Sequence, residues 1–108
     1  DPVKLDAVVL SHAHIDHSGR LPLLIKRGFG GTVFTHRACR DLCEVMLKDA
    51  GFLSEKDAEW ENRKRERKGL KLIDPLFTVD DAKAALRHFK GLVYGKKQEI
   101  LPGVTLRL

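Results

Sequence analysis

Ser11-His12-Ala13-His14-Ile15-Asp16-His17-Ser18-Gly19 is the most informative stretch of this 108-residue chain. It contains three of the five histidines of the chain, together with one aspartate. It directly follows the apolar run Ala7–Leu10, which is typical of a strand that is covered on both faces. Imidazole nitrogens and carboxylate oxygens are zinc ligands in proteins. The stretch therefore predicts the end of a buried strand that opens into a metal-binding loop.

The spacing of these residues adds geometric information. On an extended backbone, residues i and i+2 point the same way, so His12 and His14 can bind one ion. Asp16 and His17 are adjacent, and a straight strand would place them on opposite faces. If both bind a second ion, the backbone must turn there, and Ser18-Gly19 provides the flexibility for this turn.

The pattern His12-x-His14-x-Asp16-His17 resembles the signature of the metallo-β-lactamase fold superfamily. The resemblance implies an α/β fold that is part of an αββα sandwich. In this part, strand, loop, helix, strand and helix are followed by two helices and short strands. The resemblance also implies two zinc ions, the first bound by His12 and His14 and the second by Asp16 and His17. A solvated polar loop that is merely rich in histidine is the alternative interpretation.

Other parts of the chain resemble the β-CASP branch of this superfamily, most of whose members cleave or process RNA. The matching features are Gly28–Gly31 before a strand, Thr35 at a helix start, and the segments Glu61–Arg65, Asp74–Thr78 and Asp80–Ala82. One departure is visible, because Arg37 follows His36 where the branch often has a proline. The resemblance implies RNA as the partner of the whole enzyme.

For the whole enzyme, the resemblance implies hydrolysis of RNA phosphodiester bonds by a hydroxide that two metal ions activate. Asp16 is the expected catalytic residue, because it can position or deprotonate the attacking water while it binds metal. Ser11 and the backbone near Gly19 are expected to support the ligands. His36 is a candidate for a contact with the substrate phosphate. Two other functions remain open: a thioester or lactone hydrolase of the same fold, and a non-catalytic fragment that binds metal loosely or assembles with a partner.

Residues 1–108 are expected to form only part of a metallo-β-lactamase-like domain. The early strands, the later metal ligands and the inserted cap domain of the family find no counterpart in them. Ligand counting agrees, because two sites need about six ligand positions and the motif supplies four. Of the remaining histidines, His88 is expected at the surface near the end of a helix. The isolated chain is therefore expected to have little or no nuclease activity.

Apolar periodicity and turn residues predict the elements in chain order. A strand at 6–10, a helix at 21–27 and a strand at 32–35 predict a parallel βαβ unit, because the connections are short. Three helices are then expected. The first is 36–50, capped by Thr35 and stopped at Gly51; the second runs from Ser54, with Asp57 completing a capping box, to near Gly69; and the third runs from Thr78, with Asp81 three residues on, through Phe89. Short strands are expected at 92–94, 98–101 and 104–108, the last two joined by a turn at Pro102-Gly103.

A basic run lies near the end of the second of these helices, at Arg63, Lys64, Arg65, Arg67, Lys68 and Lys71. It can contact RNA phosphates and make binding salt-dependent. Alternatively, it is the solvated face of a helix whose cations pair with Glu59, Glu61 and Glu66. Trp60 is the only aromatic residue in this region, and it is expected to pack in the core.

The composition of the chain limits the class of protein and its possible partners. An apolar fraction of 43% and a charged fraction of 32% are typical of a globular domain. No apolar run approaches the roughly 20 residues of a membrane span, so no membrane partner is expected. Cys39 and Cys43 are four residues apart on an expected helix, which indicates reduced thiols and, weakly, a cytoplasmic location. A net charge of +5 is compatible with a polyanionic partner. A homo-oligomer is not excluded.

Overall fold

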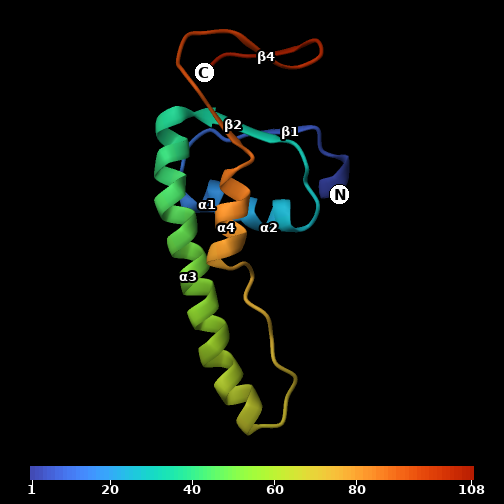
Figure 1. Cartoon of the computed structure of the whole chain (residues 1–108), viewed down its shortest axis with the longest axis vertical. Coiled ribbons are helices and arrows are strands. Elements are labelled where there is room, and N and C mark those ends of the chain that lie inside the picture. The colour runs from blue at the N-terminus through green and yellow to red at the C-terminus, as the bar shows by residue number, and fades with distance from the viewer.

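The computed structural model describes residues 1–108 and has the expected α/β character (Figure 1). The helices are α1 (Ile15–Ser18), α2 (Leu21–Lys26), α3 (Arg37–Arg67) and α4 (Val79–Leu86), preceded by a 3-10 turn at Pro2–Lys4. The strands are β1 (Ala7–Val9), β2 (Thr32–His36), β3 (Phe89–Leu92), β4 (Gln98–Leu101) and β5 (Val104–Leu106). No helix combines the length and the apolar character that crossing a membrane requires.

Strands β1, β2 and β3 form one sheet in this order, and both pairs are parallel. The predicted parallel βαβ unit is therefore confirmed. The expectation that the first strand is covered on both faces is wrong for Val9, which is 48% exposed. The physical reason is that Val8 packs against the core, so the next side chain, Val9, points to the opposite face of the sheet. Strands β4 and β5 form the expected antiparallel hairpin, and Gly103 takes the positive φ of 77° at its turn.

The third helix was expected to continue through Phe89, but α4 ends at Leu86. Phe89 instead begins β3 and pairs with Val33 of β2. The Val33 N–H donates to the His88 carbonyl at 2.8 Å, which extends the ladder by one residue. Strand pairing therefore starts earlier than the expected strand at residues 92–94. The helix start at Thr78 is confirmed, and it forms a capping box: the Thr78 hydroxyl accepts from the Asp81 N–H, and the Asp81 carboxylate accepts from the Thr78 N–H.

The first two of the three expected helices are one continuous helix, α3, which contains 31 residues. Gly51 does not stop the helix. It lies inside α3, and its lack of a side chain allows the helix to approach the start of α4. A Cβ atom at Gly51 would lie 2.7 Å from the Thr78 carbonyl oxygen and 2.9 Å from the Val79 nitrogen. Ser54 lies inside α3 and does not begin a helix, so the capping box expected with Asp57 is wrong. Its hydroxyl instead accepts a hydrogen bond from the Leu76 N–H at 3.0 Å. Both residues serve contacts with the chain that returns along α3.

Gly51→Ala is expected to destabilise the fold, because the added methyl group would collide with backbone atoms of α4. Forcing extra volume into a packed contact costs about 1–3 kcal/mol, whereas alanine gains up to about 1 kcal/mol of helix propensity. Urea unfolding should therefore show a lower free energy of unfolding for Gly51→Ala. Gly30→Ala is the matched control, since nothing lies within 4 Å of its added Cβ. A Gly51→Ala protein as stable as the wild type would contradict the role of this contact.

The hydrophobic core lies between the sheet and helices α3 and α4. Its buried members are Leu10, Ala13, Leu21, Phe29, Val33, Cys43, Leu47, Phe77, Ala82 and Phe89. The C-terminal half of α3 extends beyond this core, with only the returning chain beside it (Figure 1). The molecule is accordingly elongated, with extents of 56 × 27 × 19 Å. Trp60 lies in this extension and is 59% exposed, so its expected place in the core is wrong.

Candidate metal centre

Buried residues fix the start of the histidine loop. Leu10 and Ala13 are 5% and 6% exposed. The Leu10 N–H donates to the Phe34 carbonyl at 2.9 Å, and the Thr35 hydroxyl donates to the Leu10 carbonyl at 2.9 Å. Thr35 is therefore not the helix cap that the sequence predicts, because its hydroxyl is fully buried and holds the loop to β2. His36 takes the cap, with Nδ1 accepting from the Ala38 N–H at 3.1 Å.

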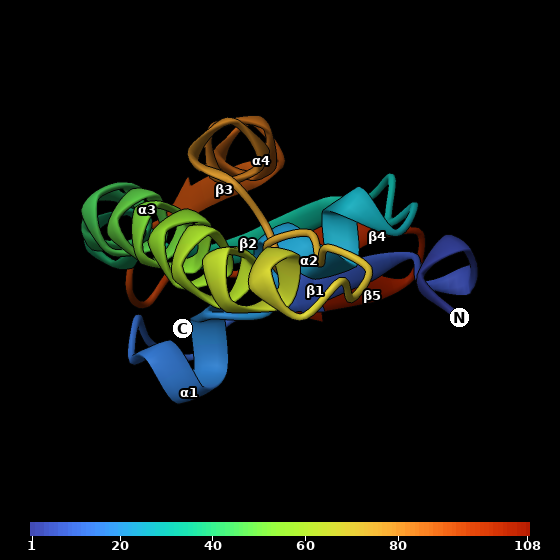
Figure 2. The same ribbon diagram turned by 90° about the horizontal axis from the view of Figure 1, so that it is seen from below.

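The turn expected at Asp16 and His17 is present as the single helical turn α1, which follows His14. The turn does not use the conformational freedom that was expected of Ser18-Gly19. Ser18 is fully buried, and its hydroxyl lies 3.0 Å from the Ala13 carbonyl and 3.2 Å from the His14 carbonyl. Gly19 has right-handed helical dihedral angles, with φ of −65°. The loop is thus held by buried hydrogen bonds, and Figure 2 shows α1 on the opposite side of β1 and β2 from α4.

Three imidazole rings of the motif meet around His12. The ring centroid of His12 is 4.8 Å from that of His14 and 4.1 Å from that of His17. Asp16 joins this group through His17, with 3.6 Å between its Oδ2 and the Nε2 of His17. The side chains of His17 and Asp16 are 47% and 76% exposed. The structure therefore brings the four predicted ligands to one exposed loop.

The chemistry of these side chains suits zinc, since three imidazoles and one carboxylate match its preferred nitrogen and oxygen ligands. Their orientations do not place three or more ligand groups around one point. The four side chains are therefore of the types that bind zinc, but they are not arranged as a coordination shell.

Ser11 contacts the ring of His12, as expected for a supporting residue. Its Oγ lies 2.8 Å from Nδ1 of His12. If Nδ1 carries the proton and donates to Oγ, the lone pair of Nε2 is free to bind a metal ion. This contact can therefore select the tautomer that binds metal through Nε2.

The two histidines outside the motif are engaged elsewhere. His36 stacks on Tyr94, with ring centroids 4.1 Å apart. Because β1 and β2 are parallel, His36 lies at the same edge of the sheet as the motif. His88 is partly buried between α4 and β3, and its Nδ1 lies 2.9 Å from the Gly31 carbonyl oxygen. His88 thus lies just after the end of a helix, as expected, but it is only partly exposed.

Sequence reasoning missed Ser18, Thr35 and the role of Cys43 beneath the loop. Cys39 and Cys43 are free thiols, as expected. Burial, followed by the neighbouring Cys39, raises the pKa of the Cys43 thiol to about 12, while the Ser18 hydroxyl acts weakly in the opposite direction. The burial of Thr35 could have been predicted, because in a strand it lies on the same face as the apolar Val33, but its backbone partner could not; both residues are fully buried.

The basic run lies far from the motif, at the end of α3 (Figure 1). Only Arg65 has an acidic partner, with its Nε 3.5 Å from Oε1 of Glu61. Glu59 lies 3.5 Å from Lys56, so its expected pairing with a cation of the run is wrong. The run is therefore solvent-exposed, as the alternative interpretation expects, but only Glu61 pairs with one of its cations.

A parallel strand ends in a His-x-His-x-Asp-His loop and is followed by a helix and a second parallel strand, as the motif led us to expect. Residues 1–42 match the family model of the metallo-beta-lactamase superfamily. This match confirms the resemblance to the superfamily that the motif predicts.

Several curated proteins are similar to most of the chain. Ribonuclease TTHA0252 of Thermus thermophilus is 39% identical over 97 residues, which is 89% of this chain and 18% of that protein. Probable RNase MJ4 of Methanocaldococcus jannaschii is 37% identical over 87% of this chain and 19% of its own length. Transcription termination factor FttA of Pyrococcus abyssi is 32% identical over 96% of this chain and 14% of its own length. The chain thus spans less than a fifth of each of these relatives.

Proposed function

We propose that this chain carries the first metal-binding motif of a zinc-dependent nuclease of the β-CASP type that hydrolyses RNA phosphodiester bonds. The observation that carries the proposal is the convergence of His14 and His17 on His12, with Asp16 beside His17, at the end of β1. The similarity to proteins named as ribonucleases supports RNA as the substrate class. Where RNA is the substrate, the cytoplasm is the proposed location.

In this proposal, His12 and His14 hold the first of two zinc ions, and Asp16 and His17 hold the second. When bound, such a pair of ions supplies Lewis acidity toward the phosphodiester and lowers the pKa of the attacking water. Asp16 would position the attacking water or accept its proton at a carboxylate oxygen, because its exposed side chain lies beside the ligand cluster. Ser11 orients the His12 ring through Nδ1. Ser18 and Thr35 fix the backbone from which the ligands project.

A segment exchange tests this proposal. The stretch of the Thermus ribonuclease that matches this chain is replaced by the chain itself, and RNA hydrolysis is measured with added zinc. We expect the chimera to cleave RNA and the same chimera with His14→Ala to lose at least about 1,000-fold in rate, because one ion loses a ligand.

The matched control is His88→Asn, which removes an imidazole outside the motif and keeps an N–H that can donate to Gly31. A folded chimera that does not cleave RNA, or whose cleavage survives His14→Ala, would overturn the proposal. The zinc affinity of the 108-residue chain provides a second test that does not depend on the folding of the chimera.

A further inference from the structure

Residues 60–71 form a basic arm, which comprises the end of α3 and the first residues of the returning chain. The arm contains six cations, Arg63, Lys64, Arg65, Arg67, Lys68 and Lys71, and two glutamates, so its net charge is +4. The whole chain has a net charge of +5. Nearly all of the excess positive charge of the protein is therefore concentrated at one end of an elongated molecule (Figure 1).

Most of these cations have no acidic partner within the chain. Apart from Arg65, none of the six cations lies within 4 Å of a carboxylate. Arg63, Lys64, Arg67 and Lys68 are all exposed. Clustered cations repel one another and attract polyanions from solution, so this arrangement favours a ligand with several phosphates.

The arm is held in place although it lies outside the core. The side-chain amide of Asn62 makes two hydrogen bonds of 2.8 Å with the backbone N–H and carbonyl of Ile73. Arg65 donates to the Lys71 carbonyl at 3.1 Å, and the Leu70 N–H donates to the Arg65 carbonyl at 2.9 Å. The cations therefore project from an ordered hairpin of helix and returning chain, and a ligand need not order that backbone first.

An exposed aromatic ring lies among these cations. Trp60 is 59% exposed, and the Nζ of Lys64 stands 3.5 Å from the centroid of its ring. Exposed aromatic rings are platforms on which unpaired bases stack, and this contact tolerates any base sequence. A base-paired helix keeps its bases stacked inside and offers mainly phosphates and sugars, so it cannot use such a ring.

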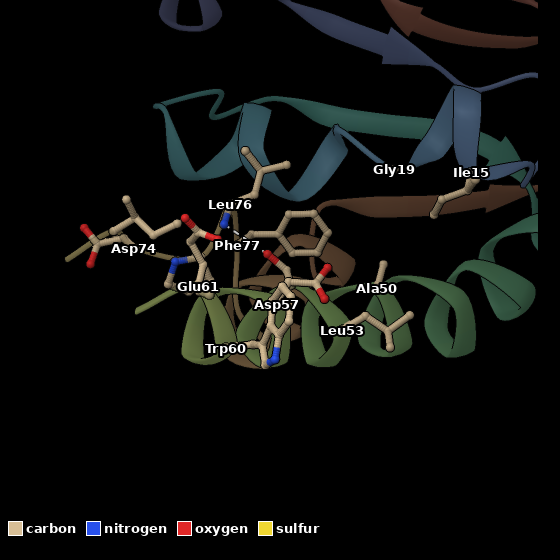
Figure 3. A pocket seen from close by; sticks show the side chains of 14 residues that line it. Ile15, Gly19, Ala50, Leu53, Asp57, Trp60, Glu61, Asp74, Leu76 and Phe77 are labelled. Carbon is tan, nitrogen blue, oxygen red and sulfur yellow. Dashed lines mark hydrogen bonds between the residues drawn. The ribbon is translucent and has the colours of Figure 1, made fainter. Parts of the chain in front are cut away.

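A groove leads from the metal loop to the arm. It has a volume of about 690 Å³ and runs along α3 from Ile15 and Gly19 to Trp60 and Asp74 (Figure 3). Most of its lining is apolar, while Asp57, Glu61 and Asp74 are acidic, which suits bases better than phosphates. From Leu53 to Arg67 the helix rises about 20 Å, so a bound strand of several nucleotides can reach both ends.

We propose that the basic arm is an exosite for single-stranded RNA, which holds the strand while its target bond lies at the metal loop. The phosphates contact Arg63, Lys64, Arg67 and Lys68, and a base stacks on Trp60. This inference rests on the proposed function for the choice of RNA over other polyanions.

The test is the anisotropy of a fluorescent 12-nucleotide oligouridine bound by the full chain in EDTA, between 50 and 200 mM salt. The variant with Arg63, Lys64, Arg67 and Lys68 all changed to Ser is expected to bind at least about 100-fold more weakly at 50 mM salt. The slope of log K against log salt should fall by about 2.8, since each phosphate contact contributes about 0.7 for single strands. Trp60→Leu is expected to weaken binding roughly 10-fold.

The matched control changes four exposed lysines outside the arm, Lys83, Lys90, Lys96 and Lys97, to Ser and should retain binding. Equal losses in both quadruple variants, tighter binding of duplex RNA, or binding of phosphatidylserine vesicles without binding of oligouridine would each overturn the exosite. Failure of the proposed function is distinguishable, because the wild-type chain would then bind oligouridine but would not bind zinc at the histidine loop. Loss of oligouridine binding alone, with zinc binding intact, counts against the exosite only.

Discussion

Zinc titration of the chain is expected to show weak binding at the histidine loop, and His12→Ala or His14→Ala is expected to weaken it at least about 100-fold. Changing a group that merely hydrogen-bonds to a metal ligand already costs 10–100-fold in affinity, and losing the ligand itself costs more. Binding should be weak in the wild type because the loop supplies four ligand side chains and no group of three is preformed. Competition with a coloured chelator measures the zinc affinity, and the visible spectrum of the Co²⁺ form reports the ligands of the ion.

Variants within and outside the loop make this experiment specific. Ser11→Ala should lower the affinity by 10–100-fold, because the His12 ring loses its contact at Nδ1. His36→Asn and His88→Asn should bind zinc like the wild type, since their imidazoles are engaged outside the loop. Equal losses in all histidine variants would contradict a site at the motif. Robust metal-dependent cleavage of RNA by this chain, abolished by His14→Ala, would overturn the expectation that it is inactive.

Local patterns in the sequence were sufficient to predict the part of the fold that carries the site. The apolar run before His12, the glycines at 28–31 and the β-branched run after them predict two parallel strands with a helix between them, and these are present. The capping box at Thr78 and the turn at Pro102-Gly103 were also predictable, because each depends on residues three or fewer positions apart. The ligands could be identified because their chemistry and spacing lie within six residues.

The errors arose where distant contacts override local signals. Gly51 and Ser54 are typical of a helix end and a helix start, yet both contact the chain that returns 20 or more residues later. Phe89 fits the apolar stripe of a helix but pairs with Val33, far away in sequence. Trp60 has the character of a core residue, but α3 carries it past the core. At the loop, the supports Ser18 and Thr35 could not be assigned because their partners are backbone carbonyls.

Cys43 is expected to make the folded chain less stable at alkaline pH. Burial raises the pKa of its thiol from 9.0 to about 12, so the unfolded chain releases this proton at a lower pH than the folded chain does. The stability that folding gains from keeping the thiol neutral is fully present below pH 9, and it is lost as the pH rises toward 12. The free energy of unfolding should fall by about 1.4 kcal/mol per pH unit within this range. Urea unfolding at pH 8 to 10.5 measures the slope.

Other groups also titrate above pH 9, so the difference between variants is decisive. Cys43→Ala should remove about 1.4 kcal/mol per pH unit from the slope, even if it also lowers stability at pH 8. Cys39→Ala should keep most of the slope, because the neighbouring thiol is the smaller cause of the raised pKa. Alkylation by iodoacetamide at pH 9 should be several hundredfold slower at Cys43 in the folded than in the unfolded chain, since only the thiolate reacts. Because Ser18 of the metal loop lies beside Cys43, rapid alkylation of Cys43 in the folded chain would mean that the loop does not stay packed on α3.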